Sequence, residues 1–293
     1  MFKLEKTERL LLGAVLVLLA VAILGPSVAQ PAHSHGFADQ RLWGRIPFAL
    51  DVLSNLPFAL WGALGLGGVA GWVWRSRALG QPRITAQHGL AALFFAGLLL
   101  TAAASAWYHW QPDDAGLLID RLGMAAAFAG LLGLAAADRA SPRAGVLLGL
   151  VMLVLGPLSV RVWSTSGNVL PWAVLQFGGM ALVLGLACLQ PLPAALAVRW
   201  SGVIMIYAAA KLLELADHEV YALTSNLISG HSLKHLVASC AAWPVVAAVM
   251  AASMGARKIR AESSSPSQTE QATQAAPSAA KACRTTSEKR SQA

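Results

Sequence analysis

The sequence predicts an all-α polytopic membrane protein, in which a seven-transmembrane-helix bundle follows one further apolar N-terminal helix. Only 12% of the 293 residues are charged and 56% are hydrophobic, whereas a soluble domain carries about 25% charged residues. The apolar runs show a helical period and not the ten-residue alternation of an outer-membrane barrel. Seven of them are long enough to cross about 30 Å of hydrocarbon, at about residues 48–74, 87–109, 117–137, 144–160, 170–189, 194–215 and 232–254.

The N-terminal segment, residues 1–29, has two interpretations. Basic residues precede an apolar run from Leu10 to Leu24, which predicts a retained transmembrane helix, although fifteen apolar residues are few for one. The alternative is a signal peptide that is cleaved after the small residues Ser27-Val28-Ala29. Both interpretations bring residue 30 to the outer side of the membrane, so the topology of the rest does not depend on the choice.

Three further regions follow. We expect an outer loop over residues 30–47, the seven-helix domain over 48–256, and a disordered polar tail over 262–293, which has no apolar period. Three cysteines without metal or redox spacing argue against a disulfide framework. The net charge of +8 comes from short loops and chain ends, so we expect no nucleic acid partner.

Loop charges predict the orientation. Basic residues occupy alternate loops, which belong on the cytoplasmic side: Arg75, Arg77, Arg83, Arg139, Arg143, Arg199, Arg257, Lys258 and Arg260. The C-terminus is then cytoplasmic, as is the N-terminus if the first helix is retained. Polar residues from distant parts of the chain all fall at the outer ends of their helices, which predicts a site there: Asp51, Asn55, His109, Asp120, His231 and His235.

The residue types at this outer edge predict a zinc site. His231 and His235 are four residues apart and share a helix face, as do Ser105 and His109. Three neutral imidazoles leave zinc one open position, where it lowers the pKa of a bound water to about 7. Asp120 is suited to move the proton of that water, and Ser105 to donate to the oxygen of the carbonyl that is attacked.

Other polar residues have simpler interpretations. Lys211 and Glu214 are spaced to form an ion pair, and with Asp217 they are structural first and supporting groups of the site second. Lys234 points to another face than the two histidines beside it, and we expect it to reach the membrane surface. The remaining histidines are expected to be solvated or interfacial: His33, His35, His88 and His218.

The motif set resembles the CREST superfamily of membrane hydrolases, which includes alkaline ceramidases and adiponectin-type receptors. The resemblance spans about residues 45–250 and rests on SAWYH at 105–109, the aspartate at 120 and HSLKH at 231–235. The stretch Asp51-Val-Leu-Ser54-Asn55-Leu-Pro-Phe also resembles a segment of alkaline ceramidases. The family's acidic calcium-binding stretch is missing, and Asp51 stands where the family has asparagine, so calcium is not expected.

The resemblance implies a seven-helix fold that holds Zn²⁺ through His109, His231 and His235, with Asp120 and Ser105 as catalytic residues. The implied reaction is hydrolysis of the amide bond of ceramide; another acyl amide or ester lipid is the alternative substrate. Compact loops look bacterial, so we expect an inner-membrane protein whose active site faces the periplasm and which needs no obligate protein partner. The alternative function is a receptor or sensor of the same superfamily with a structural zinc and little catalysis.

Overall fold

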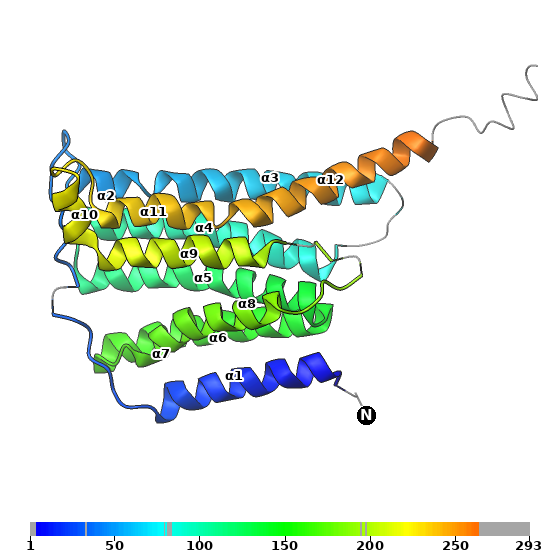
Figure 1. The fold of residues 1–293 in the computed structure, drawn as a ribbon, viewed down its shortest axis with the longest axis horizontal. Coiled ribbons are helices and arrows are strands. Elements are labelled where there is room, and N and C mark those ends of the chain that lie inside the picture. Colours follow the sequence, from blue (N-terminus) through cyan, green and yellow to red (C-terminus); the bar gives the residue numbers. More distant parts are fainter. Residues whose placement is uncertain are drawn as a thin grey trace, which may run out of the picture. The chain divides into compact units, whose positions relative to one another are not determined.

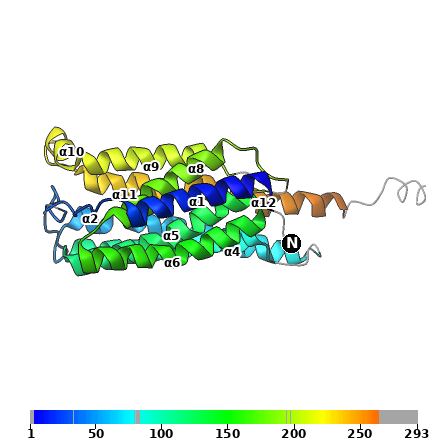
Figure 2. The same ribbon diagram turned by 90° about the horizontal axis from the view of Figure 1, so that it is seen from below.

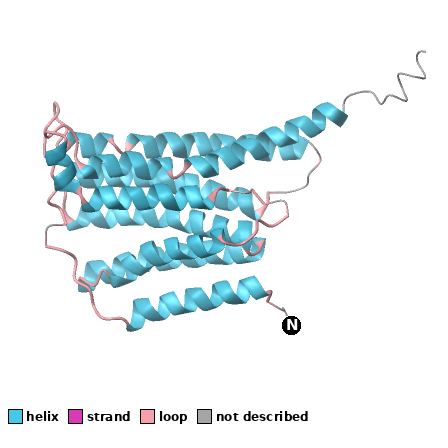
Figure 3. Cartoon of the chain, viewed as in Figure 1, coloured by secondary structure: helices cyan, strands magenta, loops and turns pink. Residues whose placement is uncertain are grey.

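A computed structural model of the chain describes residues 4–32, 34–78, 80, 84–193, 195–196 and 198–263. Helices make up all of the regular structure in this part of the chain, with no strand among the described residues (Figure 3). The predicted all-α class is therefore confirmed. The predicted tail lies outside the described residues from position 264 onward, as do His33, Arg83 and Cys283.

The helices follow one another along the chain, with a long connection over residues 25–48 between α1 and α2 (Figure 1). Their bounds are α1 Lys6–Leu24, α2 Ala49–Leu53, α3 Leu56–Ala78, α4 Ala86–Trp110, α5 Asp114–Arg139, α6 Pro142–Ser166, α7 Leu170–Ala173, the π-helical turn η1 Val174–Gly178, α8 Gly179–Ala187, α9 Trp200–Leu215, α10 Asp217–Leu223, α11 Gly230–Cys240 and α12 Trp243–Ser263. Residues up to Ser253 form one compact unit, and those from Met254 a second unit, of which the described part continues α12.

Seven of the described helical segments are long and apolar enough to cross a membrane, and α1 is one of them. The chain is thus an integral membrane protein. The predicted span over 194–215 differs, because its helix α9 has only 16 residues, or about 24 Å of length. The guanidinium of Arg139 donates to the carbonyl oxygens of Leu189 and Val198, which lie between α8 and α9, at 2.5 and 3.2 Å.

Helices α4 and α5 pack with their backbones almost in contact. A Cβ atom added to Gly97 on α4 would lie 2.3 Å from the backbone nitrogen of Ala127, and one added to Gly130 on α5 would lie 2.2 Å from that of Phe94. Small residues at a helix crossing permit such an approach in membranes. This packing holds the end of α4 beside the beginning of α5, where the predicted site residues lie.

Helix α1, which lies nearest to the viewer in Figure 2, packs against η1 and α7. Polar contacts hold its beginning and the chain just beyond its end. The buried carboxylate of Glu8 accepts hydrogen bonds from Ser141 Oγ at 2.6 Å and Arg143 Nη2 at 2.5 Å. At the other end, the amide of Val169 donates to the carbonyl oxygen of Val28 at 2.8 Å. The segment considered as a signal peptide therefore makes specific contacts with the helices that follow it.

Candidate metal centre

His109, His231 and His235 converge although more than 120 residues separate the first from the other two. One nitrogen of each ring lies within 4.8 Å of the others, and all three side chains are buried. His109 lies in the last turn of α4, and the other two lie one turn apart on α11. The predicted cluster is thus present, and it could hold a metal ion.

The distance between two of the ring nitrogens fits a shared metal. Nε2 of His231 lies 3.3 Å from Nε2 of His109, which is long for a hydrogen bond. Two zinc–nitrogen bonds of about 2.0–2.1 Å at a tetrahedral angle place their nitrogens about 3.3–3.4 Å apart. The spacing of these two imidazoles therefore suits tetrahedral coordination.

Ser54 sets the tautomer of His235. Its hydroxyl donates to the carbonyl oxygen of Asp51 at 3.0 Å and lies 2.8 Å from Nδ1 of His235. Because a hydroxyl has a single proton, Nδ1 must be the donor in the second contact. Nε2 then carries a free lone pair, which is the state that a metal ligand requires.

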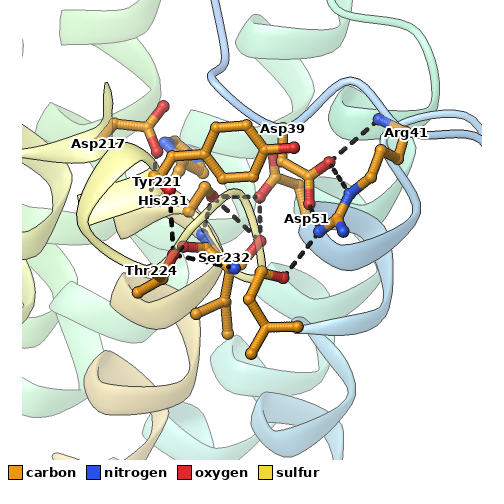
Figure 4. Close-up of polar contacts among 11 residues, drawn as sticks. Asp39, Arg41, Asp51, Asp217, Tyr221, Thr224, His231 and Ser232 are labelled. Carbon is orange, nitrogen blue, oxygen red and sulfur yellow. Dashed lines mark hydrogen bonds and ion pairs between the residues drawn. The ribbon is translucent and has the colours of Figure 1, made fainter. Parts of the chain in front are cut away.

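The beginning of α11 is held by buried polar groups. Ser229 caps the helix by accepting from the amide of Ser232 at 3.0 Å, and Ser232 Oγ donates to Asp51 at 2.5 Å. Asp217 accepts from the amide of His231 at 2.7 Å and so satisfies one of the free N–H groups of a helix N-terminus. These contacts fix the position from which His231 enters the cluster (Figure 4).

The loop before α2 covers the cluster. The ring of Phe37 lies 4.6 Å from that of His109 and 4.5 Å from that of His231, between centroids. The loop is held by an ion pair between Arg41 and the buried Asp39 at 2.6 Å, and Arg41 also donates to the carbonyl oxygen of Leu227 at 2.8 Å (Figure 4). Burial raises the pKa of Asp39, but the hydrogen bonds and charge of Arg41 outweigh burial and hold that pKa below the ordinary 3.8.

A cavity of about 740 Å³ adjoins the cluster and contains the other two predicted site residues. Asp120 and Ser105 are buried, line the cavity together with His231 and His235, and interact with each other. Asp113 caps α5 by accepting from the amide of Gly116 at 2.6 Å, which places Asp120 about two turns inside the helix. A carboxyl and a hydroxyl thus line one cavity together with two of the three candidate metal ligands, His231 and His235.

The inner part of this cavity is apolar. Its wall includes Phe94, Leu98, Phe128, Leu131, Met180 and Val203. The volume and lining of this cavity are typical of a site for a small apolar ligand, in which a few polar groups fix the orientation of the ligand. The cavity has room for a hydrocarbon chain below the histidines.

Two predictions about charged residues have opposite outcomes. Lys211 and Glu214 form the predicted ion pair. Lys234 does not extend to the membrane surface: its ammonium lies 2.7 Å from Glu214 and the side chain lines the cavity. That prediction was wrong because the ammonium pairs with the carboxylate of Glu214, on the neighbouring helix α9.

The other described histidines, His35, His88 and His218, lie apart from the cluster. His218 is exposed, and His35 is half-buried beside the Tyr108 hydroxyl, at 2.9 Å. The prediction of a solvated or interfacial ring is wrong for His88, which is 4% exposed and stacks on Trp72 with 3.5 Å between ring centroids.

No known protein-family model matches the chain, and no curated protein matches it either. Fold and site together define a helical membrane protein with seven candidate spans and a buried cluster of three histidines that could bind a metal ion.

Proposed function

We propose that the chain is a zinc-dependent membrane hydrolase that cleaves the amide bond of ceramide or of a related acyl lipid. The observation that carries this proposal is the shared cavity, in which two histidines of the cluster, His231 and His235, adjoin Asp120, Ser105 and an apolar chamber. A structural metal site would require neither the acid nor the chamber. The resemblance to alkaline ceramidases leads to the same reaction.

The donor set fits zinc with a position left for substrate. Among the described residues, the metal-binding group consists of three histidines only, which is the ligand number of catalytic zinc sites, whereas structural sites have four protein ligands. When bound, zinc lowers the pKa of a water molecule to about 7 and supplies the nucleophile.

The chain's own residues have separate tasks in the proposed reaction. Asp120 accepts the proton of the attacking water and later returns it to the nitrogen of the leaving group. Ser105 donates a hydrogen bond to the carbonyl oxygen as negative charge develops there. The apolar wall holds the acyl chain, and Phe37 screens the histidines from bulk water.

We propose the orientation from loop charges: the cluster lies toward the outer leaflet, which in a bacterial inner membrane is the periplasmic side. Contacts at the beginning of α1 and at Val28, just beyond its end, support its retention as a helix of the mature protein.

Turnover of a fluorescent ceramide by the purified, zinc-loaded protein tests the proposed function. We expect hydrolysis by the wild type and none by His109→Ala, which lacks one candidate ligand. Zinc bound by the wild type without turnover of ceramide, of other acyl amides or of acyl esters would contradict the hydrolase and favour a receptor.

A further inference from the structure

A buried guanidinium stands beside the proposed catalytic acid. Arg121 follows Asp120 on α5, is 9% exposed and lines the cavity. Its Cζ atom lies 4.1 Å from the ring centroid of Trp163 and 5.8 Å from that of Trp172. Nη2 donates to Gln30 at 3.1 Å, but Nη1 is buried without a hydrogen-bond partner among the described residues. A buried charged donor left without a partner is costly, so a ligand that accepts from it would bind favourably.

Two further cations line the cavity. Lys211 and Lys234 share the single carboxylate of Glu214, and all three side chains line the cavity. An ammonium has three N–H donors, and the contact with Glu214 uses one from each lysine. This group therefore has one positive charge in excess of its carboxylate, as well as free donors.

Among the described residues, no hydrogen bond or ion pair joins another carboxylate of the cavity to these cations, although Asp120 attracts Arg121 and Lys211 electrostatically. Asp217 accepts from two backbone amides, those of Ala38 and His231, and Glu219 is exposed at the mouth. Asp120 faces Ser105 and is needed as the base in the proposed reaction. No described residue accepts a hydrogen bond from Nη1 of Arg121, so a ligand group can serve as its acceptor.

We propose that the substrate is an acyl amide whose head group carries an anion, a carboxylate or a phosphate, which Arg121 binds with the help of Lys211 and Lys234. This inference rests on the proposed hydrolase function and specifies its substrate class. For an N-acyl amino acid, water adds to the acyl carbonyl carbon and the C–N bond breaks. The oxygen of water remains in the fatty acid, and the nitrogen takes up a proton and leaves as the amino group of the free amino acid.

Three substrates that share one acyl chain test this inference in the full-length, zinc-loaded protein. N-oleoylglycine carries a carboxylate, the phosphate ester of N-oleoylethanolamine a phosphate, and N-oleoylethanolamine no charge. We expect at least one anionic substrate to exceed the neutral one in kcat/KM by about 10- to 100-fold, the size of one charge-assisted hydrogen bond. The better of the two anions identifies the head-group chemistry.

Variants of Arg121 separate recognition from structure. Arg121→Gln should reduce the ratio of anionic to neutral kcat/KM to near one, and Arg121→Lys, which keeps the charge, should restore part of it. Lys211→Gln should lower the ratio as well. Arg161→Gln is the matched control, because Arg161 is an exposed arginine on α6 and its loss should leave the ratio unchanged. A lost packing contact would slow all substrates alike and leave the ratio as it was.

Equilibrium binding makes the test independent of turnover. Displacement of a fluorescent N-acylethanolamine should show tighter binding of the anionic lipids by the wild type and equal binding of all three by Arg121→Gln. Equal or better binding and cleavage of the neutral substrate by the wild type would overturn the inference and leave the hydrolase intact. Preferential anion binding without any cleavage would support the subsite while contradicting the hydrolase.

Discussion

The hydroxyl of Ser54 lies 2.8 Å from Nδ1 of His235, across 181 positions of the sequence. The same hydroxyl donates to the carbonyl oxygen of Asp51, so it can only accept from the imidazole. Ser54 lies in the short connection between α2 and α3. Because it accepts the proton on Nδ1 of His235, the lone pair of this candidate metal ligand on α11 is on Nε2 and is available to the cluster.

The first prediction concerns Ser54→Ala. Without the hydroxyl, His235 loses the partner that holds its ring and tautomer, and we expect zinc affinity to fall about 10- to 100-fold. Competition with a chromophoric chelator measures it. Ser239→Ala is the matched control: Ser239 is buried on the same helix, but its hydroxyl donates to the carbonyl oxygen of Leu236. An unchanged zinc affinity of Ser54→Ala would refute the role of Ser54.

A second prediction separates Asp120 from the metal ligands. Asp120→Asn keeps the size of the side chain but cannot accept a proton, so we expect kcat to fall about 10²- to 10⁴-fold with zinc content unchanged. Asp114→Asn, at a carboxylate whose side chain is 76% exposed, should retain activity. Zinc loss in Asp120→Asn would mean that this carboxyl supports the metal and would contradict its assignment as the base.

The third prediction concerns the crossing of α4 and α5. Gly97→Ala places a Cβ 2.3 Å from the backbone of Ala127, so the helices must separate, and we expect a loss of about 1–3 kcal/mol in stability. Gly89→Ala on the same helix meets no atom within 4 Å and should leave stability unchanged or raise it by up to about 1 kcal/mol. Thermal unfolding in detergent compares the two. Equal melting temperatures would contradict the close packing.

The fourth prediction concerns pH and the loop over the cluster. The pKa of Asp39 is lower in the folded protein than its ordinary value of 3.8, so its contribution to stability is present above that value and is lost as pH falls through the folded pKa. At neutral pH, Asp39→Asn should therefore cost about 1–3 kcal/mol. The difference from the wild type should shrink below about pH 4. The rate of proteolysis in the loop between α1 and α2 measures this difference in stability. A difference that persists unchanged at pH 3 would contradict the ion pair.

The sequence predicted those parts of the site that depend on spacing along one helix. The i, i+4 pairs of Ser105 with His109 and of His231 with His235 could be recognised because 3.6 residues make a turn. Hydrophobic segments and loop charges then placed both pairs in one leaflet. The helical class could be predicted from the same segments, because only α-helices and closed β-barrels span a membrane.

Contacts between distant segments could not be predicted in this way. No periodic signal links Ser54 to His235, Phe37 to the cluster or Glu8 to Arg143, because each contact depends on which helices are neighbours. The position of Lys234 was predicted wrongly for the same reason, since its partner Glu214 lies on another helix. Arg121 was not predicted as a site residue, because basic residues near helix ends usually lie at the membrane interface.

Metal content is the most direct test of the central claim that His109, His231 and His235 form a metal centre. We predict about one zinc ion per chain in purified wild-type protein and almost none in His235→Ala, measured by elemental analysis after dialysis against metal-free buffer. Ser239→Ala, one turn further along α11, should retain the metal. Absence of zinc and of any other transition metal from the wild type after reconstitution, or full zinc content in His235→Ala, would contradict the claim.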